Sequence, residues 1–250
     1  MNIFHPRRHL TTISIPKSVD SVSTDSIVLY VDIHHSRRVT DRSCFAHGLR
    51  SALDKQNRAL EDHLLGKFSL RAGADEFVGI LRPQQGVLAS LITELWWDLH
   101  PVAGRLILLK GELDVVPSRK ENGRPPLASE CDGEALWRAN EAMQELKDRD
   151  GFLWLELSES ERKNGMASAL GDSLYAQTLG WTTRQLSVLR SYMRTGSQVR
   201  TAKCLGVHQT TVSRSLSSIR SKPFLHDLRM FQDEVEQLDR EKPLREAKPW

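Results

Sequence analysis

Strand-like apolar runs and helix-like periodicities alternate along the chain from residue 27 to residue 157. The run at 27–33 is apolar and β-branched, which predicts a buried strand, and Arg71-Ala72-Gly73-Ala74-Asp75 predicts a tight turn between two later strands. The predicted strands cover residues 27–33, 68–70, 76–81, 106–109 and 152–157, and the predicted helices cover 43–64, 86–100 and 133–147. The order βαββαβ, followed by one more helix and strand, predicts an α+β domain of the ferredoxin-like class.

The rest of the chain shows only helical periodicity. Ser158 with Glu161, and Thr182 with Gln185, are spaced as capping boxes, which predicts a connecting helix at 158–180 and a new helix from 182. Two short helices at 198–205 and 209–220 and a last helix from Pro223 to about residue 239 follow. The apolar positions of the last helix, spaced 4, 3, 4 and 3, fit either a contact between two copies or packing on its own domain: Phe224, Leu228, Phe231, Val235 and Leu238.

Composition and cysteine usage bound the class of protein. The chain is 39% apolar and 27% charged, as in soluble globular proteins, and no apolar run approaches the roughly 18 residues of a membrane span. Cys44, Cys131 and Cys204 are odd in number and far apart, which favours a reducing, cytoplasmic location over a disulfide framework. Residues 1–25 are rich in Ser and Thr, and a disordered tail is favoured there over a transit peptide.

The charge is unevenly distributed. Between Trp181 and Lys222 there are eight Lys or Arg and no Asp or Glu. Because the whole chain carries +3, the remainder carries about −5, the difference between +3 and +8. A compact segment whose charge has one sign favours a polyanionic partner.

The stretch from Gly196 to Arg214 carries the strongest motif. Ala202 is small where two helices must approach closely, and Gly206 suits the left-handed turn between them. Val207 and Val212 supply the apolar inner side. This stretch resembles the helix-turn-helix of bacterial regulators and sigma-factor-like modules, which implies binding to double-stranded DNA. His208 stands where Ser or Thr often caps the recognition helix, so a weaker cap is expected.

The resemblance implies a set of DNA-contacting residues. Gln209 could read adenine and Arg214 could bind guanine or phosphate. A monomeric module covers few base pairs, so a homodimer is expected. The alternative is a helical bundle that docks an acidic protein. The expected phosphate contacts are Arg194, Arg200, Lys203 and Arg220, and the other side chains expected on the recognition helix are His208, Thr210, Thr211 and Ser213.

Two carboxylates are expected to converge in the first domain. Asp32 ends the first strand and Asp75 lies in the hairpin of its neighbour, and paired carboxylates can hold Mg²⁺ with a nucleotide. The loop after Asp32 carries possible nucleotide- or phosphate-binding residues: His34, His35, Ser36, Arg37 and Arg38. Ser36, Arg37 and Arg38 fit a phosphate-facing loop best, and a transition-metal site at the two histidines is less favoured.

These residues resemble the palm of class III nucleotidyl cyclases and GGDEF proteins. The matching pieces are Val31-Asp32-Ile33, Gly73-Ala74-Asp75-Glu76-Phe77, Gly111-Glu112 after the fourth strand and Asp132-Gly133 before the next helix. Together with the terminal helix-turn-helix, they are most similar to the SatD family of bacterial proteins, which implies a regulatory role.

Catalysis is not expected, because the sequence departs from the enzymes it resembles. Cyclases place an Asn and an Arg on the helix after the Asp-Gly turn, where this chain has Trp137 and Glu141. Arg138 and Asn140 are each one residue away, and one residue turns a helical side chain by about 100°. Ala74 replaces a glycine that GGDEF enzymes use for their guanine nucleotide.

The sequence therefore predicts a cytoplasmic transcription regulator. Its parts are a tail at 1–25, a cyclase-like domain at 26–157, a connecting helix at 158–180, a helix-turn-helix domain at 181–222 and a C-terminal helix with a tail at 223–250. The ligand of the first domain would be a nucleotide with Mg²⁺. The alternatives are a metal-dependent cyclase or nucleotide hydrolase that uses Asp32 and Asp75, and a protein-interaction adaptor.

Overall fold

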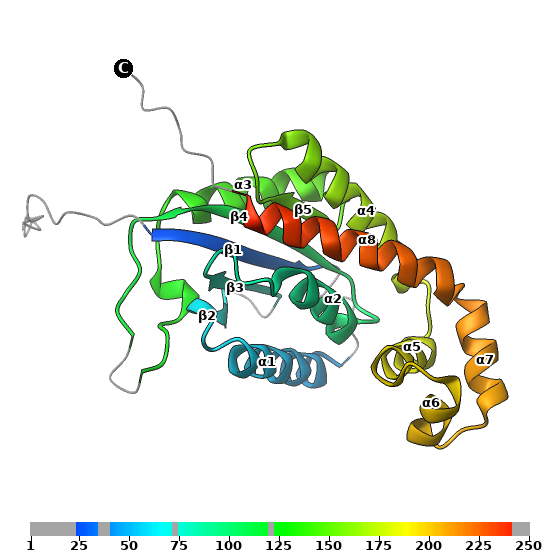
Figure 1. The fold of residues 1–250 in the computed structure, drawn as a ribbon. Coiled ribbons are helices and arrows are strands. Elements are labelled where there is room, and N and C mark those ends of the chain that lie inside the picture. Colours follow the sequence, from blue (N-terminus) through cyan, green and yellow to red (C-terminus); the bar gives the residue numbers. More distant parts are fainter. Residues whose placement is uncertain (1–23, 35–40, 72–74, 120–122, 242–250) are drawn as a thin grey trace, which may run out of the picture.

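A five-stranded sheet with helices on both faces organises the chain (Figure 1). The computed structural model describes residues 24–34, 41–71, 75–119 and 123–241. Neighbouring strands are antiparallel except for the parallel pair β4 and β5. The strand order is β2-β3-β1-β4-β5, where β1 is Thr24–Ile33, β2 is Leu64–Leu70, β3 is Glu76–Leu81, β4 is Gly104–Leu113 and β5 is Leu153–Glu156.

All five predicted strands are present, with two corrections. The first helix, α1 (Arg42–Ala59), ends before Leu64, which the periodicity had placed on it and which instead begins β2. Gly111 and Glu112 lie inside β4 rather than after it. Leu64 and Leu65 fit a strand as well as a helix, and pairing with β3 decides the outcome. Pairing of Asp25 and Ser26 with Glu112 and Gly111 extends β4 beyond its apolar run. Residues 1–23 of the predicted tail lie outside the described residues.

The strand β1 is buried on both faces, because helices cover both sides of the sheet. Ile27, Leu29 and Val31 face one core, which includes side chains of α1, α2 (Leu88–Leu99) and the later helices. Val28 and Tyr30 face a second core formed with α3 (Glu134–Asp148) and the short helix η2 (Ala128–Glu130). This two-sided burial explains why β1 is a continuous apolar run rather than an alternating one.

The predicted connecting helix is part of the core. It corresponds to α4 (Glu161–Leu179), whose N-terminus is capped by Ser160 rather than Ser158. This helix packs on β5 and on α8 (Ser221–Arg240). Trp96 of α2 stacks on Tyr175 of α4 at 4.8 Å and on Phe231 of α8 at 5.6 Å between ring centroids. Side chains of α4 and α8 therefore belong to the same core as those of the predicted domain at 26–157.

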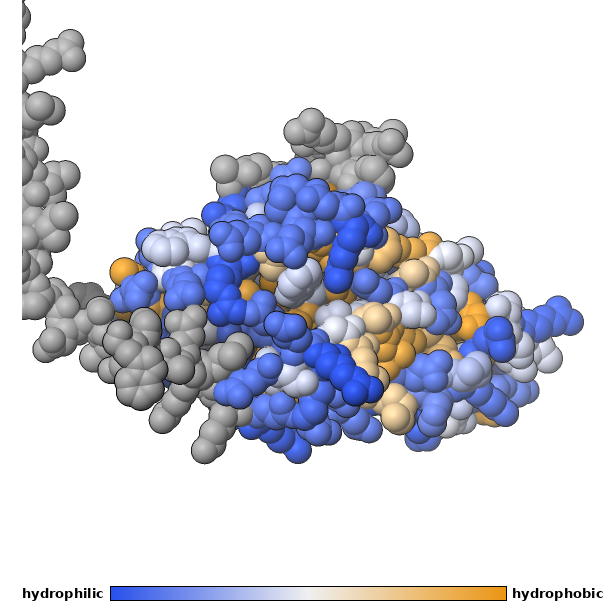
Figure 2. Space-filling model, turned by 90° about the horizontal axis from the view of Figure 1, so that it is seen from above, coloured by the Kyte–Doolittle hydropathy of each residue, from blue (hydrophilic) through white to orange (hydrophobic). Residues whose placement is uncertain are grey.

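The last helix uses its apolar seam within its own chain. The five residues spaced 4, 3, 4 and 3 are all buried. In Figure 1, α8 lies beside α4 and α2 on one face of the sheet. Most of the surface viewed from above is hydrophilic, with hydrophobic side chains showing in a band through its middle (Figure 2). Any contact between two copies would thus need a surface other than this seam.

Three short helices form a module at one end of the molecule (Figure 1). They are α5 (Thr183–Thr195), α6 (Gln198–Leu205) and α7 (Gln209–Ser218). The predicted capping box of Thr182 and Gln185 is formed, and Gly206 adopts the left-handed backbone that was predicted. Gly196, which ends α5, is left-handed as well. His208 precedes α7 without a side-chain capping bond, which agrees with the weaker cap expected there.

The turn between α6 and α7 gives a direct test of this backbone geometry. Gly206 has φ 62°, and a Cβ added there would meet no atom within 4 Å. Gly206→Ala is therefore expected to lower the free energy of unfolding by about 1 kcal/mol through backbone strain alone. Gly165 of α4 has equally open surroundings without a positive φ, so Gly165→Ala is expected to be stabilising by up to about 1 kcal/mol. Urea unfolding followed by circular dichroism measures both, and equal shifts of one sign would contradict the geometry.

Candidate functional site

The helices α6 and α7 present an outer polar face because their inner residues hold them together. Thr201, Ala202, Val212 and Leu216 are buried between the helices and the rest of the module. The residues predicted to contact DNA from the recognition helix lie outside this buried contact between α6 and α7. His208, Gln209, Thr210 and Arg214 are exposed, and Thr211 and Ser213 are half-buried.

The side chains at the start of α7 are partly ordered by α6. The Gln209 amide donates to Gln198 Oε1 at 3.1 Å, which links the first residue of α7 to the first residue of α6. Arg194, Arg200, Lys203 and Arg220 are all exposed, as a phosphate-contacting role requires. The structure thus gathers the predicted residues on one module with their polar ends in solvent.

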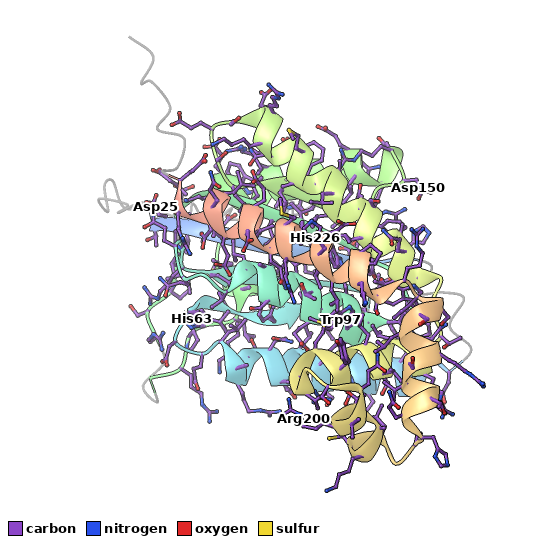
Figure 3. All side chains as sticks on the ribbon, turned by 45° about the vertical axis from the view of Figure 1, so that its right-hand side comes forward. Asp25, His63, Trp97, Asp150, Arg200 and His226 are labelled. Carbon is purple, nitrogen blue, oxygen red and sulfur yellow. The ribbon has the colours of Figure 1, made fainter. Side chains whose placement is uncertain are left out.

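One of the eight cations of the basic segment is used differently. Arg190 of α5 reaches α2, where its guanidinium pairs with Glu94 at 2.6 Å and Asp98 at 3.0 Å and lies over the Trp97 ring at 5.5 Å. Trp97 is labelled in Figure 3. Lys55 of α1 joins the same carboxylates. Arg190 therefore fastens the module to the α/β unit. Among the described residues, none of the other seven cations has a carboxylate partner.

Asp32, near the end of β1, and Asp75, just before β3, lie at adjacent ends of two neighbouring strands, as predicted. The N–H of Ile33 donates to the carbonyl of Asp75 at 2.8 Å, and Asp32 is paired in register with Glu76. The Asp32 carboxylate contacts Lys147 Nζ of α3 at 3.0 Å and the Arg105 guanidinium of β4 at 3.7 Å. The sequence pattern gave no indication of these two cations, because they come from distant elements.

The cluster around Asp32 includes further charged groups. Lys147 also approaches Glu76 at 3.6 Å, and Glu76 accepts a bond from the Tyr30 hydroxyl at 2.7 Å. Burial and that hydrogen bond raise the pKa of Tyr30 well above its ordinary value. The described contacts of Asp32 are therefore those of an ion-pair cluster, and Mg²⁺ binding by Asp32 and Asp75 stays a prediction.

The residues of α3 at or beside the cyclase Asn and Arg positions make contacts within the fold. The Trp137 indole donates to Asp132 at 3.1 Å, and Asp132 also accepts from the Gly133 N–H. Asn140 accepts from Arg71 near the β2–β3 hairpin at 2.7 Å, while Arg138 pairs with Glu156 of β5. Because β2 and β5 lie at opposite edges of the sheet, Arg138 and Asn140 do not converge on one substrate.

The predicted phosphate loop is only partly described. His34 forms a turn in which its N–H donates to the carbonyl of Ala103 at 2.8 Å. His35, Ser36, Arg37 and Arg38 lie outside the described residues, as does Ala74. Within the described ranges, no group of three or more His, Cys, Asp or Glu side chains is placed to hold a metal ion. Binding of a phosphate or metal at this loop therefore stays a prediction.

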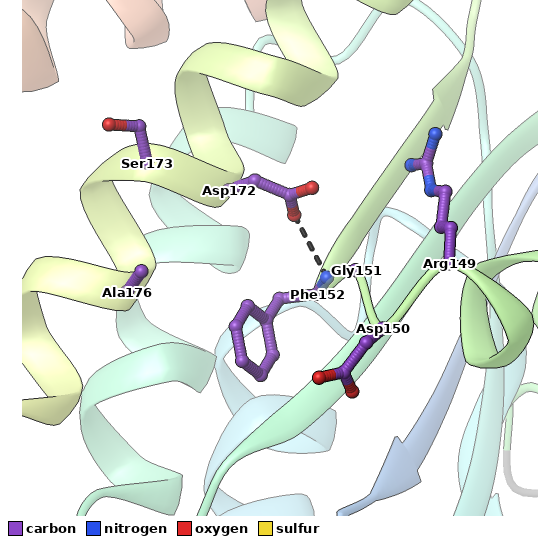
Figure 4. A pocket seen from close by; sticks show the side chains of 7 residues that line it. All are labelled: Arg149, Asp150, Gly151, Phe152, Asp172, Ser173 and Ala176. Carbon is purple, nitrogen blue, oxygen red and sulfur yellow. Dashed lines mark hydrogen bonds between the residues drawn. The ribbon is translucent and has the colours of Figure 1, made fainter.

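A small hollow at the start of β5 was missed by sequence reasoning (Figure 4). Its polar centre is Asp172 of α4, which accepts from the N–H groups of Phe152 at 2.9 Å and Leu153 at 2.6 Å. Burial raises the pKa of Asp172, and the two donors partly oppose that shift. These bonds fasten α4 to β5, so the hollow is explained by packing. A single Asp within a helix gives no sequence signal for this contact.

Comparison with known families places the chain. A family model described as the SatD family matches residues 26–226. The chain belongs to the SatD family. The matched range runs from β1 into the start of α8, so the SatD model includes the α5–α7 module as well as the α/β unit. Across the described residues, no helix of this SatD protein combines the length and apolar character needed to cross a membrane.

Comparison with other proteins adds little beyond the family. No curated protein matches this chain. Two solved structures, both described as a bacterial light-regulated adenylyl cyclase, match 53% of this chain and 43% of their own at 14% identity, with TM-scores of 0.38 and 0.37. The SatD chain thus spans less than half the length of these cyclases.

Proposed function

We propose that this SatD-family protein is a DNA-binding transcription regulator whose α5–α7 module binds double-stranded DNA. The observation that carries the proposal is the exposed face of α6 and α7, which holds side chains that bind phosphates and base edges and no acidic residue. Seven cations of the segment 181–222 lack a carboxylate partner among the described residues, so their charge is available to a polyanion.

In this proposal α7 is the recognition helix. Its first turns carry Gln209, Thr210 and Arg214 outward, and Val212 and Leu216 anchor the opposite side. A helix with this division can enter the major groove while α6 crosses the phosphate backbone. Gln209 would then contact adenine and Arg214 guanine or phosphate.

The α/β unit is proposed to be a ferredoxin-like, cyclase-like palm without turnover. The order β2-β3-β1-β4, with β1 antiparallel to both neighbours, supports this assignment. The ion pairs of Asp32 and the separation of Arg138 from Asn140 weigh against the alternative of a cyclase or nucleotide hydrolase. A homodimer in the cytoplasm, with a small ligand that sets the spacing of two modules, completes the proposal.

Recovery of genomic fragments by the purified full-length protein tests DNA binding. Wild-type protein is expected to enrich a shared motif, and Arg214→Ala to weaken binding to that motif by about 1–3 kcal/mol, roughly 5- to 150-fold. Gln209→Ala is expected to relax the preference at one position. Arg162→Ala serves as a matched control, because Arg162 is an exposed cation on α4, outside the module.

The outcomes distinguish a sequence-specific DNA-binding regulator from a protein-interaction adaptor. Equal weakening by Arg162→Ala and Arg214→Ala, without a motif, would show that the charge acts generically and would overturn sequence-specific regulation. An absence of salt-dependent affinity for any duplex would overturn DNA binding altogether. In that case the module would be better explained as an adaptor for an acidic protein.

A further inference from the structure

The first turns of α8 carry a basic stripe that begins at Lys222, the last cation of the proposed module, and continues beyond the module. Lys222, His226 and Arg229 are exposed and follow one another at spacings of four and three residues. That spacing places all three on the same face of the helix. The opposite face is buried through Phe224, Leu228 and Phe231. The stripe is therefore held rigidly toward solvent by the core beneath it.

The stripe is limited to the half of α8 that adjoins the module. Residues 221–230 contain Lys222 and Arg229 against a single acid, Asp227, which gives +1 with His226 counted as neutral. Residues 231–240 contain four acids and one arginine, which gives −3. Farther along the same face, Arg240 pairs with Glu236 at 3.4 Å. The charge thus changes sign along one helix face.

The stripe follows directly from α7. Arg220 lies in the turn between the two helices with φ 50° and ψ 46°, and its side chain is exposed. In Figure 1, α7 leads from α6 at the lower right up to the start of α8. Arg214, Arg220, Lys222 and Arg229 therefore follow one another along the chain with Asp227 as the one acid between them. None of these four cations has a carboxylate partner among the described residues.

We propose that the first half of α8 is a second DNA contact surface, which binds the phosphate backbone beside the site read by α7. The partner is double-stranded DNA, and the inference rests on the proposed function of the module. Lys222 and Arg229 supply the charge, and the imidazole of His226 supplies a hydrogen-bond donor in either protonation state. The acidic second half of α8 marks where the contact ends.

The dimensions fit this role. Lys222 and Arg229 are seven residues apart, so their Cα atoms are separated by about 10 Å along the helix axis, and phosphates along one strand are about 3.4 Å apart in axial rise. The stripe can therefore follow about three phosphates. Such contacts add affinity and fix orientation but read no sequence.

The test uses the full-length protein and a duplex of about 30 base pairs, roughly three helical turns. Lys222→Gln with Arg229→Gln removes two charges and keeps good helix formers on an exposed face. Fluorescence anisotropy across a salt series is expected to show a slope of log affinity against log salt that is smaller by about 2, and affinity lower by on the order of tenfold or more near 0.1 M salt. Arg240→Gln, on the same face of the same helix, is expected to leave both unchanged.

Footprinting separates this inference from the proposed function. The double variant is expected to keep protection of the central site and lose protection on one flank. An unchanged slope and footprint, with wild-type binding intact, would overturn the α8 contact alone. Wild-type protein without DNA affinity would overturn both proposals, and equal effects of Arg240→Gln and the double variant would show that overall charge, not this surface, is responsible.

Discussion

Phe231→Ala is expected to lower the free energy of unfolding by about 3–5 kcal/mol, the usual cost of removing a fully buried aromatic ring. Phe231 is completely buried on α8 and stacks on Trp96 of α2 at 5.6 Å, and Trp96 in turn stacks on Tyr175 of α4. The cavity would lie where three helices meet. Urea unfolding followed by tryptophan fluorescence measures the effect.

The neighbouring Met230 provides the control for this substitution. Its side chain is 55% exposed on the same helix, so Met230→Ala is expected to change stability by less than about 0.5 kcal/mol. A loss below about 1 kcal/mol for Phe231→Ala would contradict the packing of α8 on its own chain. It would also reopen the interpretation of the apolar seam as a contact between two copies.

Asp32→Ala is expected to cost about 3 kcal/mol, because it leaves the buried Arg105 with only the exposed Asp150 as a carboxylate partner. The Asp32 side chain is 13% exposed, and its partner Arg105 is 8% exposed. Lys147 loses its shorter contact, at 3.0 Å, and keeps only Glu76 at 3.6 Å. Thermal and urea unfolding of the variant measure this loss.

Asp150→Ala tests the same arginine from its other side. Asp150 contacts Arg105 at 2.9 Å, but its side chain is 80% exposed, so removing it is expected to cost roughly 0–1 kcal/mol. Equal costs for the two variants would contradict a buried cluster at Asp32. A wild-type melting temperature that rises with Mg²⁺ and ATP or GTP, and turnover that Asp32→Ala abolishes, would instead support the enzyme alternative.

The position of the module suggests how the two parts could communicate. The helices on either side of α5–α7 are α4 and α8, and both belong to the core of the α/β unit. Arg190 adds ion pairs from α5 to Glu94 and Asp98 of α2. A ligand that shifted α2, α4 or α8 would therefore change the orientation of the proposed recognition helix, which is how the proposed regulator would respond.

Much of the secondary structure could be predicted from the sequence, because local periodicity and turn chemistry encode it. The continuous apolar run of β1, the capping box at Thr182 and the left-handed glycines Gly196 and Gly206 each depend on residues close in the chain. The same locality explains the placement of the exposed side chains on α7. The neighbouring positions of Asp32 and Asp75 follow instead from the βαββ order of the strands, which the sequence also predicted.

The tertiary structure decided what the polar and apolar side chains contact. Asp32 is neutralised by Arg105 and Lys147, which stand 73 and 115 residues away in sequence, and periodicity carries no information about such pairs. The seam of α8 could face its own chain or another, and the stacking of Trp96, Tyr175 and Phe231 determines that it faces its own. By itself, the sequence determined the elements and the basic segment. Packing between distant elements determined that Asp32 lies in an ion-pair cluster and that Arg190 anchors the module instead of joining its exposed face.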